Sequence, residues 1–178
     1  MTPDQLKALI RTVPDFPAPG ILFRDITTLI ANGPGFAACI DHLATLAEKA
    51  QPAAVAGIEA RGFIFGAALA ARMGLGFIPI RKPGKLPVPT IGIDYALEYG
   101  QDRLEIDPTA ISPDQRLVLI DDLIATGGTA LAATQLLRKA GAHVTHALFV
   151  IDLRDLGGAS RLREAGLTVE ALMDFPGH

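Results

Sequence analysis

Continuous apolar runs recur along the chain, and each predicts a strand that is buried on both faces of a sheet. These runs lie at residues 55–58, 77–80, 117–120 and 144–151, and a further strand is expected near residues 167–172. Between them the apolar positions follow a helical spacing, at residues 62–73, 128–139 and about 160–165. Strands that alternate with helices predict an α/β fold, in which a mostly parallel central sheet has helices on both faces.

The N-terminal part of the chain carries two more helical patterns. Thr2 is the expected N-cap of the first, and its apolar face would consist of Leu6, Leu9, Ile10 and Val13. The second pattern spans residues 35–50. The segment between them, FPAPGILFRDI at residues 16–26, is broken by prolines and a glycine and is expected to be ordered but irregular. The first strand of the chain is therefore expected near residue 53.

Residues 90–106 show a different pattern. Apolar and small or polar residues alternate at Ile91, Ile93, Tyr95 and Leu97, and again at Leu104 and Ile106 after Gly100. Alternation on both sides of a glycine predicts an antiparallel pair of strands that stands off the main sheet. The stretch before it is rich in proline and glycine, a composition suited to a flap that closes over a site.

The composition narrows the class of protein. Hydrophobic residues make up 49% of the 178 residues and charged residues 20%, which is typical of a single folded domain and argues against disorder. The one cysteine, Cys39, lies in an apolar run, so a packed thiol is expected. The N-terminus lacks the pattern of a signal peptide and no run is long enough to cross a membrane, so a cytoplasmic protein is expected. A net charge of -3 disfavours a duplex nucleic-acid binder but allows a small anionic ligand.

The strongest candidate for chemistry follows the apolar run at residues 117–120. This run leads into two aspartates, then into a Thr-Gly-Gly-Thr turn and a helix. The glycines let the backbone turn sharply, so that its N–H groups and the helix N-terminus form an anion site, to which the threonine hydroxyls add donors. Because no lysine follows the glycines, a monophosphate is expected rather than the triphosphate of a Gly-Lys-Ser/Thr loop.

A phosphate held at residues 125–129 would leave an attached ribose beside Asp121 and Asp122. Ionised carboxylates accept hydrogen bonds, and the two neighbouring hydroxyls of a ribose are matching donors. The carboxylates would also favour positive charge that develops on the sugar ring. The alternative is an ordinary strand-to-helix turn with an aspartate as an incidental cap, but the combined pattern favours a ribose-phosphate site.

This run resembles the phosphoribosyl diphosphate signature of the type I phosphoribosyltransferases. The resemblance implies one domain, residues 1–178, with a five-stranded parallel core, a small N-terminal hood mainly at 1–35 and a flexible catalytic flap at about 82–106. It implies that Asp121 and Asp122 contact the ribose hydroxyls. The residues that it assigns to the 5-phosphate are Ala125, Thr126, Gly127, Gly128 and Thr129. It also implies Mg²⁺, bound mainly through the substrate and water with no direct protein ligand.

Two other predicted strand ends carry residues suited to a pyrophosphate. The guanidinium of Arg61, which follows the strand at 55–58, can bind two oxygens of a phosphate. By the resemblance, the loop of Glu59, Ala60 and Arg61 holds the pyrophosphate, often with a non-proline cis peptide bond. The next strand ends in three cations that can neutralise a leaving group, namely Arg81, Lys82 and Lys85. The alternatives are a surface salt bridge for Arg61 and a solvated basic turn for the three cations.

The segments RKPGKLP, YALEYG and FPAPGILFRDI are together similar to the adenine-specific members of that family, over about residues 13–175. This similarity implies that Phe23 stacks on the purine, that Leu22 and Arg24 shape the base pocket, and that Leu156 closes its other face. It puts Glu98 and Tyr99 on the catalytic flap, with Glu98 as the candidate general acid or base. Burial statistics alone favour a core position for Phe23, and a solvated strand residue is the alternative for Glu98.

The implied activity is a pentosyl transfer in purine salvage, from phosphoribosyl diphosphate to adenine, which gives AMP and pyrophosphate. Arg61, Lys82, Lys85 and Mg²⁺ would stabilise the leaving group, and the resemblance also implies a homodimer. Transfer to xanthine, guanine or hypoxanthine is the alternative activity. A regulator of the same fold that binds DNA would need an added DNA-binding module, and none fits in the segment before residue 53.

Overall fold

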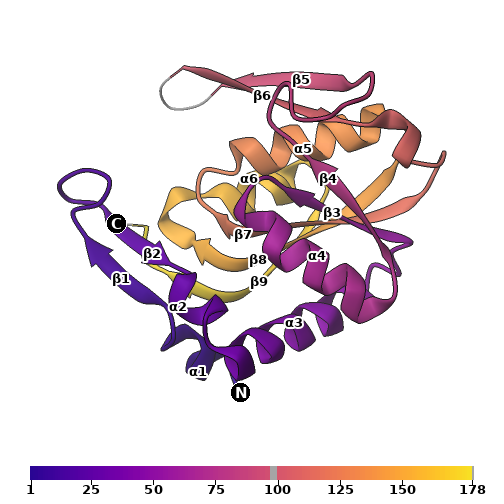
Figure 1. The fold of residues 1–178 in the computed structure, drawn as a ribbon. Helices are drawn as coiled ribbons and strands as arrows, with labels where there is room; N and C mark the ends of the chain where they lie inside the picture. The colour runs from indigo at the N-terminus through magenta and orange to yellow at the C-terminus, as the bar shows by residue number, and fades with distance from the viewer. Residues whose placement is uncertain (97–99, 178) are drawn as a thin grey trace.

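The computed structural model describes residues 1–96 and 100–177. Within those residues the central feature is a parallel five-stranded sheet in the order β4-β3-β7-β8-β9 (Figure 1). Its strands are β3 (Ala54–Ile58), β4 (Gly76–Ile80), β7 (Arg116–Ile124), β8 (His143–Leu153) and β9 (Thr168–Phe175). The predicted α/β fold with a parallel central sheet is confirmed.

Helices pack on both faces of this sheet. The core on one face contains side chains of α1 (Pro3–Lys7), α2 (Thr27–Ile30), α3 (Gly33–Glu48) and α4 (Arg61–Met73). The core on the other face contains side chains of α5 (Gly128–Lys139) and α6 (Gly158–Glu164). Alternate residues of β7 belong to the cores on the two faces of the sheet, because successive side chains of a strand point to opposite faces. Val118 and Ile120 thus pack with α3 and α4, and Leu117 and Leu119 pack with α5.

The N-terminal region differs from the prediction. α1 ends at Lys7, and Val13 lies in a strand, β1 (Arg11–Pro14), that pairs antiparallel with β2 (Leu22–Asp25). The expectations of a helix that reaches Val13 and of a first strand near residue 53 are therefore wrong, and the segment 16–26 is irregular only in part. Each strand has only four residues and pairs with the other in a two-stranded sheet. Such short strands are too brief to show a clear alternation of apolar and polar residues in the sequence.

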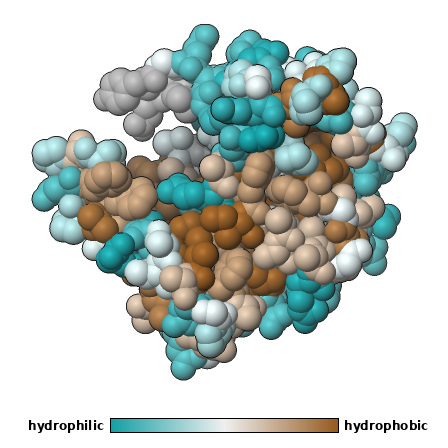
Figure 2. Space-filling model, viewed as in Figure 1, coloured by the Kyte–Doolittle hydropathy of each residue, from teal (hydrophilic) through white to brown (hydrophobic). Residues whose placement is uncertain are grey.

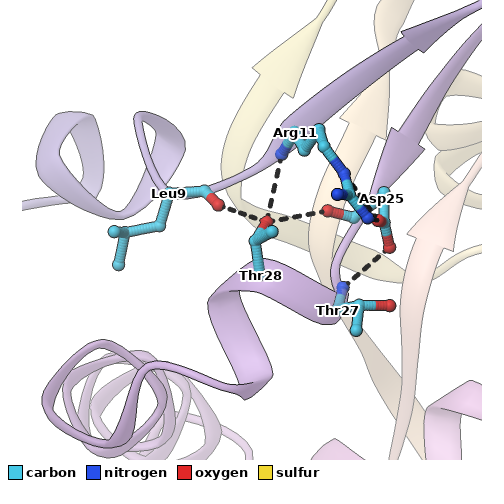
Figure 3. A network of polar contacts seen from close by, with 5 residues as sticks. All are labelled: Leu9, Arg11, Asp25, Thr27 and Thr28. Atoms are coloured by element: carbon cyan, nitrogen blue, oxygen red, sulfur yellow. Dashed lines mark hydrogen bonds and ion pairs between the residues drawn. The ribbon is translucent and has the colours of Figure 1, made fainter.

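Polar contacts fix the base of the β1–β2 sheet against α2 (Figure 3). The hydroxyl of Thr28 donates to the carbonyl of Leu9 at 2.5 Å and accepts from the N–H of Arg11 at 3.2 Å. Nη2 of Arg11 lies 2.5 Å from Oδ2 of Asp25, and the other oxygen of Asp25 accepts from the N–H of Thr27 at 2.9 Å. β2 is therefore held firmly at its carboxyl end.

The predicted antiparallel pair is confirmed. β5 (Ile91–Ala96) pairs with β6 (Gln101–Ile106), with Tyr95 directly opposite Asp102, and this sheet lies over α5 (Figure 1). Its inner side chains, Ile91, Ile93 and Tyr95, pack against the same core as α5. A bridge between Arg81 and Glu105 joins the end of β4 to β6.

Short 3₁₀ turns lie at Pro108–Ala110 and Arg154–Leu156. Within the described ranges, no helix has the length and apolar character needed to span a membrane. The division of residues 1–178 into one domain with a hood at 1–35 and a flap at 82–106 stays a prediction.

Candidate active site

The predicted phosphate loop lies between β7 and α5. β7 continues through Asp121 and Asp122 to Ile124, because its pairing with β8 extends that far, so the expectation that the strand ends at residue 120 is wrong. Gly127 then caps α5 with a φ of +80°, a left-handed conformation that favours glycine. A Cβ atom at Gly127 would also lie 2.9 Å from the carbonyl oxygen of Gly158, so the loop has no room for a side chain there.

A cleft of about 390 Å³ opens at this loop. The predicted phosphate, ribose and pyrophosphate residues in its lining are Glu59, Ala60, Arg61, Lys82, Asp121, Asp122, Ala125, Thr126, Gly127, Gly128 and Thr129. Segments that follow different strands, and that lie far apart in the sequence, thus meet in one cavity. Among the described residues, the lining includes neither Arg81 nor Lys85.

Arg61 links the cleft to the N-terminal sheet. Its Nε lies 2.9 Å from Oδ2 of Asp122, which is buried, and its guanidinium carbon lies 5.8 Å from the centre of the Phe23 ring. The ion pair is closest at Nε, and a guanidinium has five N–H donors, so donors of Arg61 remain for an anion in the cleft.

Asp121 and Asp122 perturb each other. Burial and the neighbouring charge of Asp122 raise the pKa of Asp121 well above its ordinary value. Burial also raises the pKa of Asp122, although the positive charge of Arg61 opposes this rise. Asp122 is therefore the carboxyl that carries negative charge more readily, and the pair can both accept and donate hydrogen bonds at sugar hydroxyls.

The junction of β3 and α4 brings the backbone close to these carboxyls. The peptide bond between Glu59 and Ala60 is cis, as the resemblance implies for this loop. A Cβ atom on Gly62, in the first turn of α4, would lie only 2.7 Å from Oδ1 of Asp121. The carboxyl of Asp121 can therefore occupy its position only because residue 62 has no side chain.

Acidic neighbours hold two of the three cations that follow β4, Arg81 and Lys82. Nε of Arg81 lies 3.2 Å from Oε2 of Glu59, and the same oxygen accepts from the N–H of Lys82 at 2.9 Å. Burial opposes the charge on Glu59, but these hydrogen bonds outweigh it and lower the pKa of Glu59. Nζ of Lys82 is paired with Asp102 of β6, and Nη1 of Arg81 donates to the carbonyl of Lys85 at 3.1 Å. This run is thus a fixed turn, not a freely solvated one.

A second, apolar pocket of about 310 Å³ adjoins the cleft. Its lining comprises Ile21, Leu22, Phe23, Arg24, Arg61, Leu123, Leu153, Leu156 and Gly177, and so includes all four residues predicted for the base. Arg61 and Leu123 line both cavities. Figure 2 shows the surface hollowed between the β1–β2 sheet, at the left, and the body of the molecule.

Phe23 and Arg24 point to different neighbours, as successive residues of a strand do. The Phe23 ring packs edge-on against Phe16, with ring centres 5.1 Å apart, and is only partly buried, so it is not a plain core residue. Arg24 is buried, and its Nη1 donates to the hydroxyl of Thr12 at 2.7 Å. Its guanidinium lies 4.7 Å from the centre of the Phe175 ring. Arg24 therefore ties β2 to β1 and β9.

The two predicted flap residues, Glu98 and Tyr99, lie outside the described residues. Within residues 1–96 and 100–177, no group of three or more His, Cys, Asp or Glu side chains could hold a metal ion.

Comparison with known proteins identifies the family. The phosphoribosyl transferase domain family matches residues 26–163, well over half of the chain. The chain is 80% identical over 178 residues, all of both chains, to the adenine phosphoribosyltransferase of Novosphingobium aromaticivorans, and 68% identical over the same length to that of Erythrobacter litoralis. The chain belongs to the adenine phosphoribosyltransferase family.

Solved structures of this phosphoribosyltransferase family share the fold. The adenine phosphoribosyltransferase from Thermoanaerobacter pseudethanolicus has a TM-score of 0.92 at 44% identity, covering 98% of this chain and 100% of that one. The enzyme from Saccharomyces cerevisiae, in complex with an imino-altritol bisphosphate and adenine, has a TM-score of 0.91 at 37% identity, covering 96% of this chain and 98% of that one.

Two side chains at or beside the candidate site, Leu123 and Asp102, were not predicted from the sequence. Leu123 lines both cavities, yet in the sequence it is one apolar residue among several after the aspartates. Asp102 pairs with Lys82 across 20 residues of chain, and no local pattern marks it. Only the period-2 alternation of β5 and β6, which puts Tyr95 and Asp102 opposite each other once the register is known, could have pointed to it.

Proposed function

We propose that the protein transfers the 5-phosphoribosyl group from phosphoribosyl diphosphate to adenine, giving AMP and pyrophosphate in purine salvage. The observation that carries this proposal is the pair of adjoining cavities, one lined by several charged residues and one mainly apolar, that share Arg61 and Leu123. A sugar phosphate fits the first and a planar base fits the second, so the bond between them would form where the cavities meet. The adenine in the related S. cerevisiae complex supports the choice of base.

In this reaction a ring nitrogen of adenine forms a bond to C1 of the ribose while the bond from C1 to the pyrophosphate oxygen breaks. The pyrophosphate leaves with the electron pair, and the attacking nitrogen gives its proton to a general base, for which Glu98 is the candidate from the sequence. Positive charge develops on the sugar ring and negative charge on the leaving group, so groups fixed in advance near each of them would lower the barrier.

Asp121 and Asp122 are the groups proposed to act on the sugar. They line the cleft next to the loop of residues 125–129, where the 5-phosphate would accept hydrogen bonds from backbone N–H groups and threonine hydroxyls. Asp122 would carry the charge that stabilises the ring, because Arg61 favours its ionised form.

Arg61 and Lys82 are the groups proposed to bind the leaving pyrophosphate, because both line the cleft and both carry free donors. Arg81 and Lys85 would act from behind the lining through their charge, and Glu59 would hold Arg81 and the backbone of Lys82 in place. The roles of Glu98 as general acid or base and of Tyr99 on the flap rest on the sequence alone.

Phe23, Leu22, Arg24 and Leu156 are proposed to enclose the adenine. Phe23 would stack on one face of the base and Leu156 would cover the other, since both line the apolar pocket. Arg24 would act through its fixed position in β2, because its side chain is engaged with Thr12 and Phe175.

Mg²⁺ is the proposed cofactor, bound mainly through the substrate and water. The cleft fits an ion held in this way, because Mg²⁺ keeps several waters and needs only one or two carboxylates together with substrate phosphates. Glu59, Asp121 and Asp122 are carboxylates in the lining of the cleft that could accept hydrogen bonds from the waters of such an ion, and the bound ion would neutralise charge on the pyrophosphate. We also propose that the protein acts as a homodimer in the cytoplasm, on small-molecule substrates and without nucleic acid or membrane partners.

The test is an assay of base-dependent pyrophosphate release, with Mg²⁺ and phosphoribosyl diphosphate and with each purine in turn. The proposal expects release with adenine to exceed release with hypoxanthine, guanine or xanthine by at least about tenfold, a difference set by the hydrogen-bonding pattern of the base. Faster release with another purine would support the transfer reaction but show that this purine, and not adenine, is the preferred substrate. No release with any purine would refute the transfer.

A further inference from the structure

A polar cluster connects the β5–β6 sheet to both ends of the cleft. It consists of Lys82, Tyr95, Asp102 and Thr129, and we refer to it as the Asp102 cluster. Lys82 follows β4 and Thr129 belongs to the first turn of α5, while Tyr95 and Asp102 face each other across the β5–β6 sheet. The carboxylate of Asp102 therefore contacts Lys82 directly and is linked to Thr129 through the hydroxyl of Tyr95.

Both oxygens of Asp102 are engaged. Oδ2 is paired with Nζ of Lys82 and accepts from the hydroxyl of Tyr95 at 3.2 Å, and Oδ1 accepts from the N–H of Arg103 at 2.8 Å. The hydroxyl of Tyr95 in turn accepts from the hydroxyl of Thr129 at 3.4 Å. The orientation of Asp102 is thus set by its own strand and by the neighbouring strand.

The ion pair at the centre of the cluster stays charged at neutral pH. Burial works against the charge on Lys82, but the hydrogen bond to Asp102 and the nearby negative groups outweigh it and raise the pKa of Lys82. Burial likewise works against the charge on Asp102, and the contact with Lys82 lowers its pKa. Lys82 therefore remains a cation, although its surroundings partly exclude water.

Lys82 and Asp102 differ in their access to the cleft. Lys82 lines the cleft next to Glu59 and Arg61, whereas Asp102 is not part of the lining formed by the described residues. An ammonium group has three donors, so a contact with Asp102 leaves donors for an anion in the cleft. A lysine side chain also loses much rotamer freedom when it is fixed, and Asp102 fixes it before any ligand arrives.

We propose that Asp102 is a positioning residue that holds the ammonium of Lys82 at the pyrophosphate end of the cleft, and that Tyr95 steadies Asp102 from the neighbouring strand. This inference rests on the proposed function, because it takes the ligand at this end of the cleft to be a pyrophosphate. It predicts that loss of the carboxylate weakens the binding of pyrophosphate, even though a negative charge is removed from the neighbourhood of an anion.

Isothermal titration calorimetry with pyrophosphate tests the proposal in Asp102→Asn and Asp102→Ala, with ribose 5-phosphate as the second probe. Because the pair is partly exposed, Asp102→Ala should weaken pyrophosphate binding by about three- to fivefold. Asp102→Asn, which keeps one acceptor, should fall between this variant and the wild type. Both should bind ribose 5-phosphate as the wild type does, because the side chain of Asp102 makes no direct contact with the loop at residues 125–129. Asp94→Asn is the matched control, since Asp94 is an aspartate of the same sheet that is paired with Arg103 on an exposed surface.

Pyrophosphate binding that is unchanged or tighter in both Asp102 variants would overturn the proposal. Tighter binding would mean that Asp102 competes with pyrophosphate for the ammonium of Lys82. An equal loss for Asp94→Asn, or an equal loss of ribose 5-phosphate binding, would also overturn it, because the effect would then be one of charge or folding. Binding is measured without turnover, so the two proposals can fail separately. A wild type that binds pyrophosphate but makes no AMP refutes the proposed activity alone, and a wild type that makes AMP but does not bind pyrophosphate refutes the proposed role of Asp102 alone.

Discussion

Alanine at Gly62 would place a Cβ atom 2.7 Å from Oδ1 of Asp121, 3.2 Å from the carbonyl oxygen of Ile120 and 3.3 Å from the Cα atom of Asp121. Two of these neighbours belong to the backbone of the central strand β7, so the side chain of Asp121 is the part that can move. To restore an ordinary contact, the carboxyl must retreat by roughly 0.7 Å, which exceeds the tolerance of about 0.5 Å for a catalytic group.

A displacement of this size should act on the chemical step. A misplacement of about 1 Å in an active site can cost about 100-fold in rate, so a retreat of the Asp121 carboxyl should lower kcat by about tenfold or more. The KM for adenine should change little, because Phe23 and Leu156 in the apolar pocket are untouched. The loss of stability should be modest, since overpacking costs about 1–3 kcal/mol and alanine favours a helix over glycine by about 1 kcal/mol.

Gly66→Ala is the matched control on the same helix. Its Cβ atom would lie 2.6 Å from Cε2 of Phe77 and 3.1 Å from Cγ2 of Ile120, so it would overpack the apolar core without contacting a carboxyl. Both variants should lower Tm by a few degrees, but only Gly62→Ala should lower kcat. Initial rates at a temperature well below Tm, with thermal melts of each variant, separate the two effects. A normal kcat for folded Gly62→Ala, or an equal fall in Gly66→Ala, would refute the reasoning.

Three further predictions address the sugar, the base and the N-terminal sheet. Asp121→Asn should lower kcat by about tenfold or more with little change in the KM for adenine, because an amide cannot reproduce the hydrogen bonds of this carboxyl to the ribose hydroxyls; unchanged steady-state kinetics would contradict that role. Phe23→Ala should raise the KM for adenine by about tenfold and leave that for phosphoribosyl diphosphate unchanged, since stacking of a base on an aromatic ring is worth about 1–3 kcal/mol. Hydrogen bonds from the side chain and the N–H of Thr27, and from Arg11, lower the pKa of Asp25 from 3.8 to about 2. The contribution of Asp25 to stability is therefore complete above pH 3.8 and is lost as the pH falls through 2, so the difference in Tm between wild type and Asp25→Asn should shrink over that interval.

The central sheet was predictable because a strand that is buried on both faces appears in the sequence as a continuous apolar run. The apolar runs at 55–58 and 77–80 lie within β3 and β4, which have nearly the predicted bounds. The end of β7 was not predictable in the same way, since Asp121 and Asp122 belong to the strand only through their pairing with β8. The strands β1 and β2 were missed for a similar reason, because the strand hydrogen bonds of each come from the other.

The members of the candidate site were easier to predict than their contacts. Polar residues at strand ends identified Arg61 and the loop at 125–129, and the parallel topology explains why they meet in one cleft. The partners of the cations depend on distances across the fold. Glu59 holds Arg81 across 22 residues of chain, and neither residue type nor spacing specifies that pair.

The turn formed by Leu156, Gly157 and Gly158 links the two cavities. Leu156 lines the apolar pocket, and two residues later the N–H of Gly158 donates to the carbonyl of Ala125 at 3.0 Å. A Cβ atom on Gly158 would lie 2.7 Å from the backbone nitrogen of Gly127, so the main chain at Gly158 packs directly against the main chain of the loop. This main-chain contact therefore fixes the position of Leu156, a wall of the apolar pocket, relative to the loop at residues 125–129, so a shift of that loop would also change the shape of the apolar pocket.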